Sequence, residues 1–187
     1  MRDPIETVIQ RELQSGENVL WSGSPRTGIR LRAADAFLIP FSLLWGGFAI
    51  FWEIMAIKSG PIFFVLWGIP FVLVGLYLVF GRFAVDAWAR NATVYGVTNQ
   101  RVIIASGFPR SGVRSLNLHN LGELAMTERR DLSGDITFGT SAHPMAFLLH
   151  GGWPGAGRYV PPAFEMIENV RKVHGIILQA QKQNQQR

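Results

Sequence analysis

Two long runs of apolar residues constrain the fold of this chain more than any other feature. Residues 36–52 carry no charge, and a second uncharged run covers residues 61–80; between them only Glu53 and Lys58 are charged. A helix rises about 1.5 Å per residue and the hydrocarbon core of a bilayer is about 30 Å thick, so each run is long enough to span a membrane. The sequence therefore predicts a pair of transmembrane helices.

A buried position in a soluble core is a poor alternative for these runs. Each is apolar on all sides, and the rest of the chain offers no helices that could surround them. A cleavable signal peptide fits less well still, because the first run starts after residue 35 and a second run follows it. The 48% of hydrophobic residues in the chain reflects this one inserted block, since the remainder has ordinary polarity.

The connection between the runs predicts the topology. Residues 58–60 (KSG) allow only a tight turn, so both ends of the helix pair face the same side of the membrane. The turn carries one lysine, whereas arginines flank the two outer ends: Arg26, Arg30, Arg32, Arg82 and Arg90. By the positive-inside bias, we expect an inner-membrane protein with two spans and both termini in the cytoplasm.

The first predicted span extends past residue 52 to Ile57, and Glu53 is the single acidic residue inside either span. A carboxylate within a membrane is by default a candidate for an ion or proton path. It lies about one helical turn from the tip of the predicted hairpin, however, so a solvated position at the interface is the alternative that we favour.

The chain outside the apolar block divides into further parts. Residues 1–33 are expected to form a short amphipathic helix and an extended segment, because DPIE at residues 3–6 has an N-cap acid and a proline at the first helical position. The helical hairpin covers residues 34–81. A β-domain with a C-terminal helix is expected over 86–180, and residues 181–187 form a polar tail.

After the hairpin, the apolar period changes to two. Residues 93–98 and 101–105 are rich in β-branched side chains, and the intervening TNQR predicts a turn. Further short alternating segments follow at Leu116, Leu124, Ile136 and Met145–Leu149. A period near 3.6 then links Phe164, Ile167, Val170, Val173, Ile177 and Leu178. We expect about seven antiparallel strands closed into a barrel by one C-terminal helix, with Tyr95, Val97, Ile103, Leu116 and Phe138 in its core.

This outline resembles the bacterial pleckstrin-homology-domain membrane proteins, in which a transmembrane hairpin is followed by a cytosolic barrel. The resemblance is carried by GENVLWSGSPR at 16–26, YGVTNQRVII at 95–104, SLNLHNL at 115–121 and GDITFG at 134–139. It implies a pleckstrin-homology-like fold, but it does not imply a chemistry.

The sequence shows no pattern typical of a catalytic or metal-binding site. The histidines His119, His143, His150 and His174 are scattered without zinc-ligand spacing, and the chain has no cysteine. GGWPGAG at 151–157 lacks the order of a dinucleotide-binding loop. We therefore predict no enzyme activity, no catalytic residues, no metal and no cofactor.

Charge keeps a binding function open. From residue 82 onward there are 12 Lys and Arg against 7 Asp and Glu, and no recognition helix for nucleic acid accompanies them. The candidate lipid-headgroup contacts are Arg101, Arg110, Arg114, Arg129 and Arg130. An apolar groove between the barrel and the last helix, with Phe164 and Ile167 as anchors, is the candidate protein site. We predict a protein-interaction or assembly module, with binding to anionic lipid as the alternative; the identity of the partner is open, a second copy of the chain included.

Overall fold

The computed structural model describes residues 4–28, 31, 34–107, 111–139 and 161–186. The chain divides into two compact units. The first, here called the β-unit, comprises Met1–Gly28, Ala87–Ala142 and Val160–Arg187. The second, the hairpin unit, comprises Ile29–Asp86 and His143–Tyr159. Residues 1–28, which precede the first apolar run, thus belong to the β-unit.

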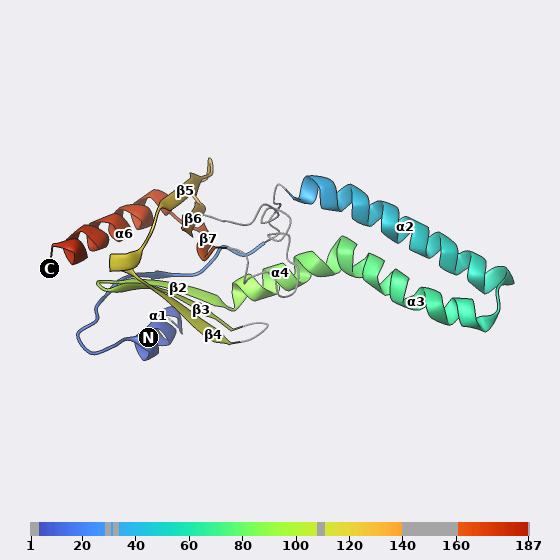
Figure 1. The fold of residues 1–187 in the computed structure, drawn as a ribbon, viewed down its shortest axis with the longest axis horizontal. Coiled ribbons are helices and arrows are strands. Elements are labelled where there is room, and N and C mark those ends of the chain that lie inside the picture. The colour runs from blue at the N-terminus through green and yellow to red at the C-terminus, as the bar shows by residue number, and fades with distance from the viewer. Residues whose placement is uncertain (1–3, 29–30, 32–33, 108–110, 140–160, 187) are drawn as a thin grey trace. The chain divides into compact units, whose positions relative to one another are not determined.

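Helices α2 and α3 make up most of the described part of the hairpin unit (Figure 1). Helix α2 covers Asp35–Ser59, and α3 covers Ile62–Leu76. A π-helical turn, η1 (Tyr77–Gly81), continues α3 into α4 (Arg82–Asn91), so that helical backbone runs from Ile62 to Asn91. The predicted turn is confirmed, because only Gly60 and Pro61 separate α2 from α3.

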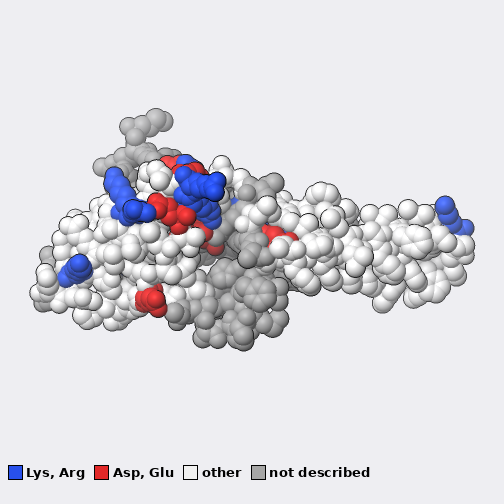
Figure 2. Space-filling view, turned by 90° about the horizontal axis from the view of Figure 1, so that it is seen from above, with Lys and Arg blue, Asp and Glu red and all other residues white. Residues whose placement is uncertain are grey.

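Helix α2 and the continuous helix Ile62–Asn91 are long and apolar enough to cross a membrane, as predicted. Their most apolar 18-residue windows have a mean hydropathy of 1.6 and 2.5, yet only 17% and 11% of these windows are buried. The core helix of a soluble protein would be mostly buried. Figure 2 accordingly shows a long uncharged surface along the hairpin.

Small residues bring α2 and α3 together. Ser42, Gly46, Ala49 and Ala56 are the small buried residues of α2 and recur at intervals of three, four or seven. At the closest approach, a Cβ added to Gly75 would lie 3.0 Å from the Gly46 Cα. Such contacts let helix backbones pack closely where no hydrophobic effect drives them together.

Glu53 of α2 packs against α3 where the two helices are in contact. Its side chain is half-buried, its Oε2 is buried without a hydrogen-bond partner among the described residues, and a Cβ at Gly68 would overlap that oxygen. The carboxyl group therefore lies on the neighbouring helix, whereas the sequence favoured a solvated position.

The β-unit contains two antiparallel sheets. The first has the order β1-β2-β3-β4, with strands Val19–Gly23, Thr93–Thr98, Arg101–Ser106 and Gly112–Asn117. The second has the order β5-β6-β7, with strands Leu124–Glu128, Gly134–Phe138 and Ala163–Ile167. A 3₁₀ turn (Leu118–Asn120) follows β4, and two helices complete the unit: α1 (Pro4–Glu12) and α6 (Val170–Gln185) (Figure 1). The predicted segment Met145–Leu149 lies outside the described residues.

The register of β2 and β3 corrects the expected core. Tyr95 pairs with Ile104 and Val97 pairs with Val102, and all four contribute to one core cluster. Ile103 pairs instead with Gly96, whose added Cβ would meet the side chain of Ile9. Opposite residues in an antiparallel pair share a face, so Ile103 is buried on the other face of the sheet, which α1 covers.

The core cluster joins both sheets and α6. Phe164 is its centre, with ring centroids 4.5 Å from Tyr95, 5.0 Å from Phe138 and 5.7 Å from Trp21. One backbone hydrogen bond links the outer ends of the sheets, from the Arg26 N–H to the Met166 carbonyl at 2.9 Å. The described strands form two sheets, and a closed barrel is not formed by their ladders.

The apolar period near 3.6 that links Phe164 to Leu178 belongs only in part to a helix. Phe164 and Ile167 lie on β7, and α6 starts at Val170. In a regular strand, residues three apart face opposite sides. Met166 has a φ of 51°, in the left-handed region, and the β6–β7 register shifts beside it, so both Phe164 and Ile167 enter the core.

Candidate functional site

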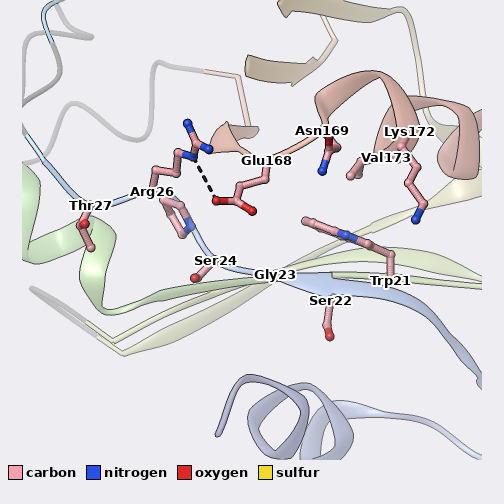
Figure 3. A pocket seen from close by; sticks show the side chains of 11 residues that line it. Trp21, Ser22, Gly23, Ser24, Arg26, Thr27, Glu168, Asn169, Lys172 and Val173 are labelled. Carbon is pink, nitrogen blue, oxygen red and sulfur yellow. Dashed lines mark hydrogen bonds and ion pairs between the residues drawn. The ribbon is translucent and has the colours of Figure 1, made fainter. Parts of the chain in front are cut away.

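The β-unit has a cavity of about 530 Å³ between the end of β1 and the start of α6 (Figure 3). Its walls come from the segment at and after β1 and from the β7–α6 connection with the first turn of α6. The residues used below are Trp21, Gly23, Arg26, Glu168, Asn169 and Lys172, and we call this cavity the β1–α6 pocket. A cavity of this size can hold a small ligand or a few side chains of a partner.

Arg26 ties the walls of the pocket together. Its Nε donates to Glu168 Oε1 at 3.1 Å, and its Nη1 donates to Asp131 Oδ2 at 2.7 Å. Its backbone N–H donates to Met166, as described above. One residue thereby connects the end of β1 with the β5–β6 turn and with the β7–α6 connection. Both ion pairs are well exposed, so their role is to orient segments more than to stabilise the fold.

Backbone strain gathers around this junction. Leu132, Met166 and Asn169 are the non-glycine residues with positive φ among those described, at 63°, 51° and 48°. Such conformations cost about 1–3 kcal/mol when the residue is not Gly or Asn, and they persist where surrounding contacts hold them. Here Asp135 Oδ1 accepts from the Met166 N–H at 2.7 Å, and the Leu132 carbonyl accepts from the Val170 N–H at 3.2 Å.

Asp131 is kept ionised beside Arg26. The hydroxyl of Ser133 donates to Asp131 Oδ1 at 2.7 Å, and the Ser133 N–H donates to the same oxygen at 3.3 Å. These hydrogen bonds, the hydroxyl first, lower the pKa of Asp131 below its ordinary value, and the charge of Arg26 lowers it further. The charge pair at this edge of the pocket therefore persists throughout the neutral range.

An indole ring lines the pocket. A Cβ added to Gly23 would lie 2.5 Å from the Trp21 ring, so glycine is required there for the ring to lie along β1. Asn169 precedes α6 without a side-chain cap hydrogen bond, and Lys172 is exposed on the first turn (Figure 3). The pocket thus offers an aromatic surface, an amide and an ammonium group, closed at one end by the Arg26–Glu168 pair.

This set of groups suits binding. Among the described residues, no group of three or more His, Asp or Glu is placed to hold a metal. Within the pocket the acidic group, Glu168, is ion-paired with Arg26. Recognition through ring contact and hydrogen bonds is the chemistry that the described pocket supports.

Arg101, a predicted headgroup contact, is engaged within the β-unit. Its Nε and Nη2 donate to Glu17 Oε1 and Oε2 at 2.9 and 3.0 Å, and Nη2 also donates to the Glu12 carbonyl at 2.5 Å. The Thr98 hydroxyl donates to Glu17 Oε1 at 2.7 Å. Burial by itself would raise the pKa of Glu17, but the hydrogen bonds from Arg101, the Gln14 N–H and Thr98 outweigh it and lower that pKa.

The other predicted arginines lie apart. Arg129 Nη2 donates to Asp135 Oδ2 at 2.8 Å, Arg114 is exposed on β4, and Arg130 is exposed in the β5–β6 turn. Arg110 lies outside the described residues. Figure 2 shows basic and acidic groups side by side over the β-unit. The structure does not gather the described arginines into one basic site, and their contact with lipid stays a prediction.

The predicted groove anchors, Phe164 and Ile167, are fully buried. Both belong to the core cluster, and side chains of α6 cover them. The space between β7 and α6 is therefore filled by the chain itself at these two residues, and no open groove exposes them.

Sequence reasoning missed the β1–α6 pocket. Arg26 was noted only as a flank of the first apolar run, and its partner Glu168 lies 142 positions away. No local spacing connects residues so far apart. The available signal was the motif GENVLWSGSPR itself, which places Trp21, Gly23 and Arg26 on one short segment.

No family model, curated protein or solved structure matches this chain.

Proposed function

We propose that this protein is a non-enzymatic inner-membrane protein whose cytosolic β-unit serves as a protein-interaction or assembly module. Helices α2 and α3 anchor it as a two-span hairpin with both termini in the cytoplasm. The observation that carries the anchor is that two helices with windows of mean hydropathy 1.6 and 2.5 leave most of their surface uncovered. Such a surface is stable in lipid and would aggregate in water.

The fold of the module is proposed to be pleckstrin-homology-like. The described residues form seven antiparallel strands in two sheets, followed by a C-terminal helix on a shared core, and this arrangement supports the proposal. The backbone hydrogen bond between Arg26 and Met166 supports it as well, because it joins the segment that follows β1 to β7, and these two strands are the outer strands of the two sheets.

The β1–α6 pocket is the proposed binding surface for a protein partner. Its Trp21 ring, Asn169 amide and Lys172 ammonium group match the mixed contacts typical of protein recognition. Binding of anionic lipid by the β-unit has weaker support, because Arg101 and Arg129 already pair with carboxylates. Tethering to the membrane would raise the effective concentration of the module near other membrane proteins.

Topology is tested first. A cytoplasmic reporter fused after Arg187 or before Met1 should be active, and a periplasmic reporter at either end should be silent. Periplasmic activity at one end would contradict the hairpin anchor.

Partner class is tested by photo-crosslinking in intact membranes. A photo-reactive phenylalanine in place of Lys172 should give a discrete, protease-sensitive adduct. The same group in place of Ser115, exposed on β4, is the matched control and should give none. A phospholipid adduct from Lys172 would favour the lipid alternative, and equal adducts from both positions would refute the pocket as the binding surface.

A further inference from the structure

The hairpin unit holds buried polar groups where its apolar helices end. Asp35 is the first residue of α2 and Arg82 is the first residue of α4; both are 5% exposed. Asp35 Oδ1 lies 2.8 Å from Arg82 Nη1, an ion pair that is close without hydrogen-bond alignment. Tyr77, the first residue of the π-helical turn, lies one turn before Arg82.

Several buried donors of Arg82 and Tyr77 have no hydrogen-bond partner in the part of the chain that the structure describes. The Nε and Nη2 of Arg82 are buried and have no hydrogen-bond partner among the described residues. The Tyr77 hydroxyl is in the same state. Buried polar groups in native proteins are nearly always paired with protein, water or a bound ion, so each of these atoms calls for a ligand.

The local backbone is built around these two residues. The Arg82 N–H donates to the Tyr77 carbonyl, which widens the turn from α to π geometry. A Cβ added to Gly81 would lie 2.7 Å from the Tyr77 ring, so glycine allows the ring to lie back on the turn. Single π turns inside helices are frequent at functional sites, because they re-aim side chains.

The part of the Arg82 guanidinium that has no hydrogen-bond partner among the described residues has a defined geometry. Its Nη1 faces Asp35, which leaves the Nε–Nη2 edge of the guanidinium, a planar fork of two parallel N–H groups. This edge matches two oxygens of a phosphate group. Asp35 acts as a positioning residue, because it holds the opposite nitrogen.

The residues next to Arg82 indicate which class of phosphate compound would bind there. Leu76 and Phe80, on the helix just before Arg82, are 47% and 68% exposed. In the proposed membrane topology these side chains reach the acyl chains, and Arg82 ends the apolar run at the depth of the headgroups. We propose that Arg82, together with Tyr77, binds the phosphate diester of a glycerophospholipid. This inference rests on the membrane anchor of the proposed function.

The test uses the full-length protein, purified in mild detergent, with lipid retention measured by native mass spectrometry. The probes are phosphatidylglycerol and a galactolipid, which has similar acyl chains but no phosphate. Wild-type protein should retain phosphatidylglycerol about tenfold better than galactolipid, and Arg82→Gln should abolish that preference. Lys182→Gln, which removes an equal charge from the exposed last turn of α6, should leave it unchanged. Tyr77→Phe should reduce retention severalfold.

Several outcomes would overturn the assignment. Equal retention by wild type and Arg82→Gln, or equal retention of the two lipids, would do so. Displacement of phosphatidylglycerol by inorganic phosphate at low millimolar concentration would assign the site to free phosphate and overturn the lipid assignment.

Two controls separate the causes of failure. Far-UV circular dichroism reports whether Arg82→Gln folds; if it does not, Arg82→Lys keeps the charge without the fork, and it should retain less phosphatidylglycerol than wild type. Wild-type retention by Arg82→Lys would refute the fork. Alkaline carbonate extraction of wild-type membranes tests the anchor separately. Extraction of the protein would refute the proposed function, whereas stable insertion without lipid preference would refute only this site.

Discussion

Two arginines of this chain, the half-buried Arg101 and the buried Arg82, are both ion-paired but have opposite surroundings. Arg101 in the β-unit donates through Nε and Nη2 to both oxygens of Glu17, and to the Glu12 carbonyl as well. Arg82 in the hairpin unit pairs with Asp35 through Nη1, and its Nε–Nη2 edge is unfilled among the described residues. The same edge of the arginine side chain is hydrogen-bonded in one unit, whereas in the other it is buried without a partner among the described residues.

The difference distinguishes an ion pair that stabilises the fold from one that is a candidate binding site. Glu17 and Arg101 fix α1 and the segment before β1 to the β2–β3 hairpin, and the hydrogen bonds to Glu17 are complete enough to lower its pKa. This pair is structural. The Asp35–Arg82 pair leaves the Nε and Nη2 of Arg82 buried without a hydrogen-bond partner among the described residues, which is costly unless something else binds them. That pair is a candidate site.

The largest expected effect contrasts the packing of the two units. Phe164→Ala removes the ring at the centre of the β-unit core and should lower the free energy of unfolding by about 3–5 kcal/mol. Phe48→Ala in α2 removes a ring that is 64% exposed, and it should change stability by less than about 0.5 kcal/mol. Denaturant unfolding in detergent, followed by near-UV circular dichroism, measures both. Equal effects would mean that the hairpin has a packed core of its own around Phe48.

The second prediction concerns the satisfied arginine. Glu17→Gln keeps the shape of the side chain but removes its charge, and should destabilise the β-unit by about 3 kcal/mol because Arg101 loses its ionic partner. Glu168→Gln breaks an exposed pair with Arg26 and should cost less than about 0.5 kcal/mol. Chemical denaturation of the two variants compares them. A Glu17 variant as stable as wild type would show that the pair does not hold α1 in place.

Lowering the pH of the wild-type protein should remove the stabilisation that ionised Glu17 contributes. The pKa of Glu17 is lower in the folded than in the unfolded state, so the stabilisation is fully present above the unfolded value of about 4.3. It is lost as the pH falls through the lowered folded value. In Glu17→Gln this part of the acid destabilisation should be absent, which a pH series of unfolding curves tests directly.

The hairpin was readable from sequence because its signal is compositional. Uncharged runs at 36–52 and 61–80 and a short turn set the ends of α2 and the start of α3 within a few residues. What composition does not contain is side-chain pairing across the helices. The contact of Glu53 with Gly68 and the pair of Asp35 with Arg82 depend on helix rotation, so neither was predicted.

In the β-unit the strands were readable and their faces were not. Alternation located β2 and β3, but Val102, Ile103 and Ile104 are three consecutive apolar residues, and only α1 on the second face explains why all are apolar. The left-handed backbone at Met166 likewise hid a strand within an apparent helical period. The β1–α6 pocket joins the two ends of the chain, beyond the reach of any local pattern.

Close packing in the hairpin gives the third prediction. Gly75→Leu would force a side chain against the Gly46 backbone and should destabilise the α2–α3 contact by about 1–3 kcal/mol. Gly47→Ala, at a position with open space around it, should be neutral or slightly stabilising, because alanine favours helix. Hydrogen–deuterium exchange of the two helices in detergent reports both changes. Unchanged exchange in Gly75→Leu would argue that the helices do not depend on this approach.

The smallest expected effect concerns Asp131, which is ion-paired with Arg26 of the β1–α6 pocket. It tests whether hydrogen bonds within the β-unit lower the pKa of Asp131. Ser133→Ala removes the hydroxyl that donates to Asp131 Oδ1, so the pKa of Asp131 should rise toward the ordinary value of about 3.9 while Arg26 still favours the ionised form. Carbon-detected titration of the Asp131 carboxyl measures the change, and Ser115→Ala on β4 is the matched control. Because Asp131 is exposed, stability at neutral pH should hardly move. A pKa unchanged by Ser133→Ala would mean that Arg26, and not the turn, governs this carboxylate, and Arg26→Gln would then produce the larger shift.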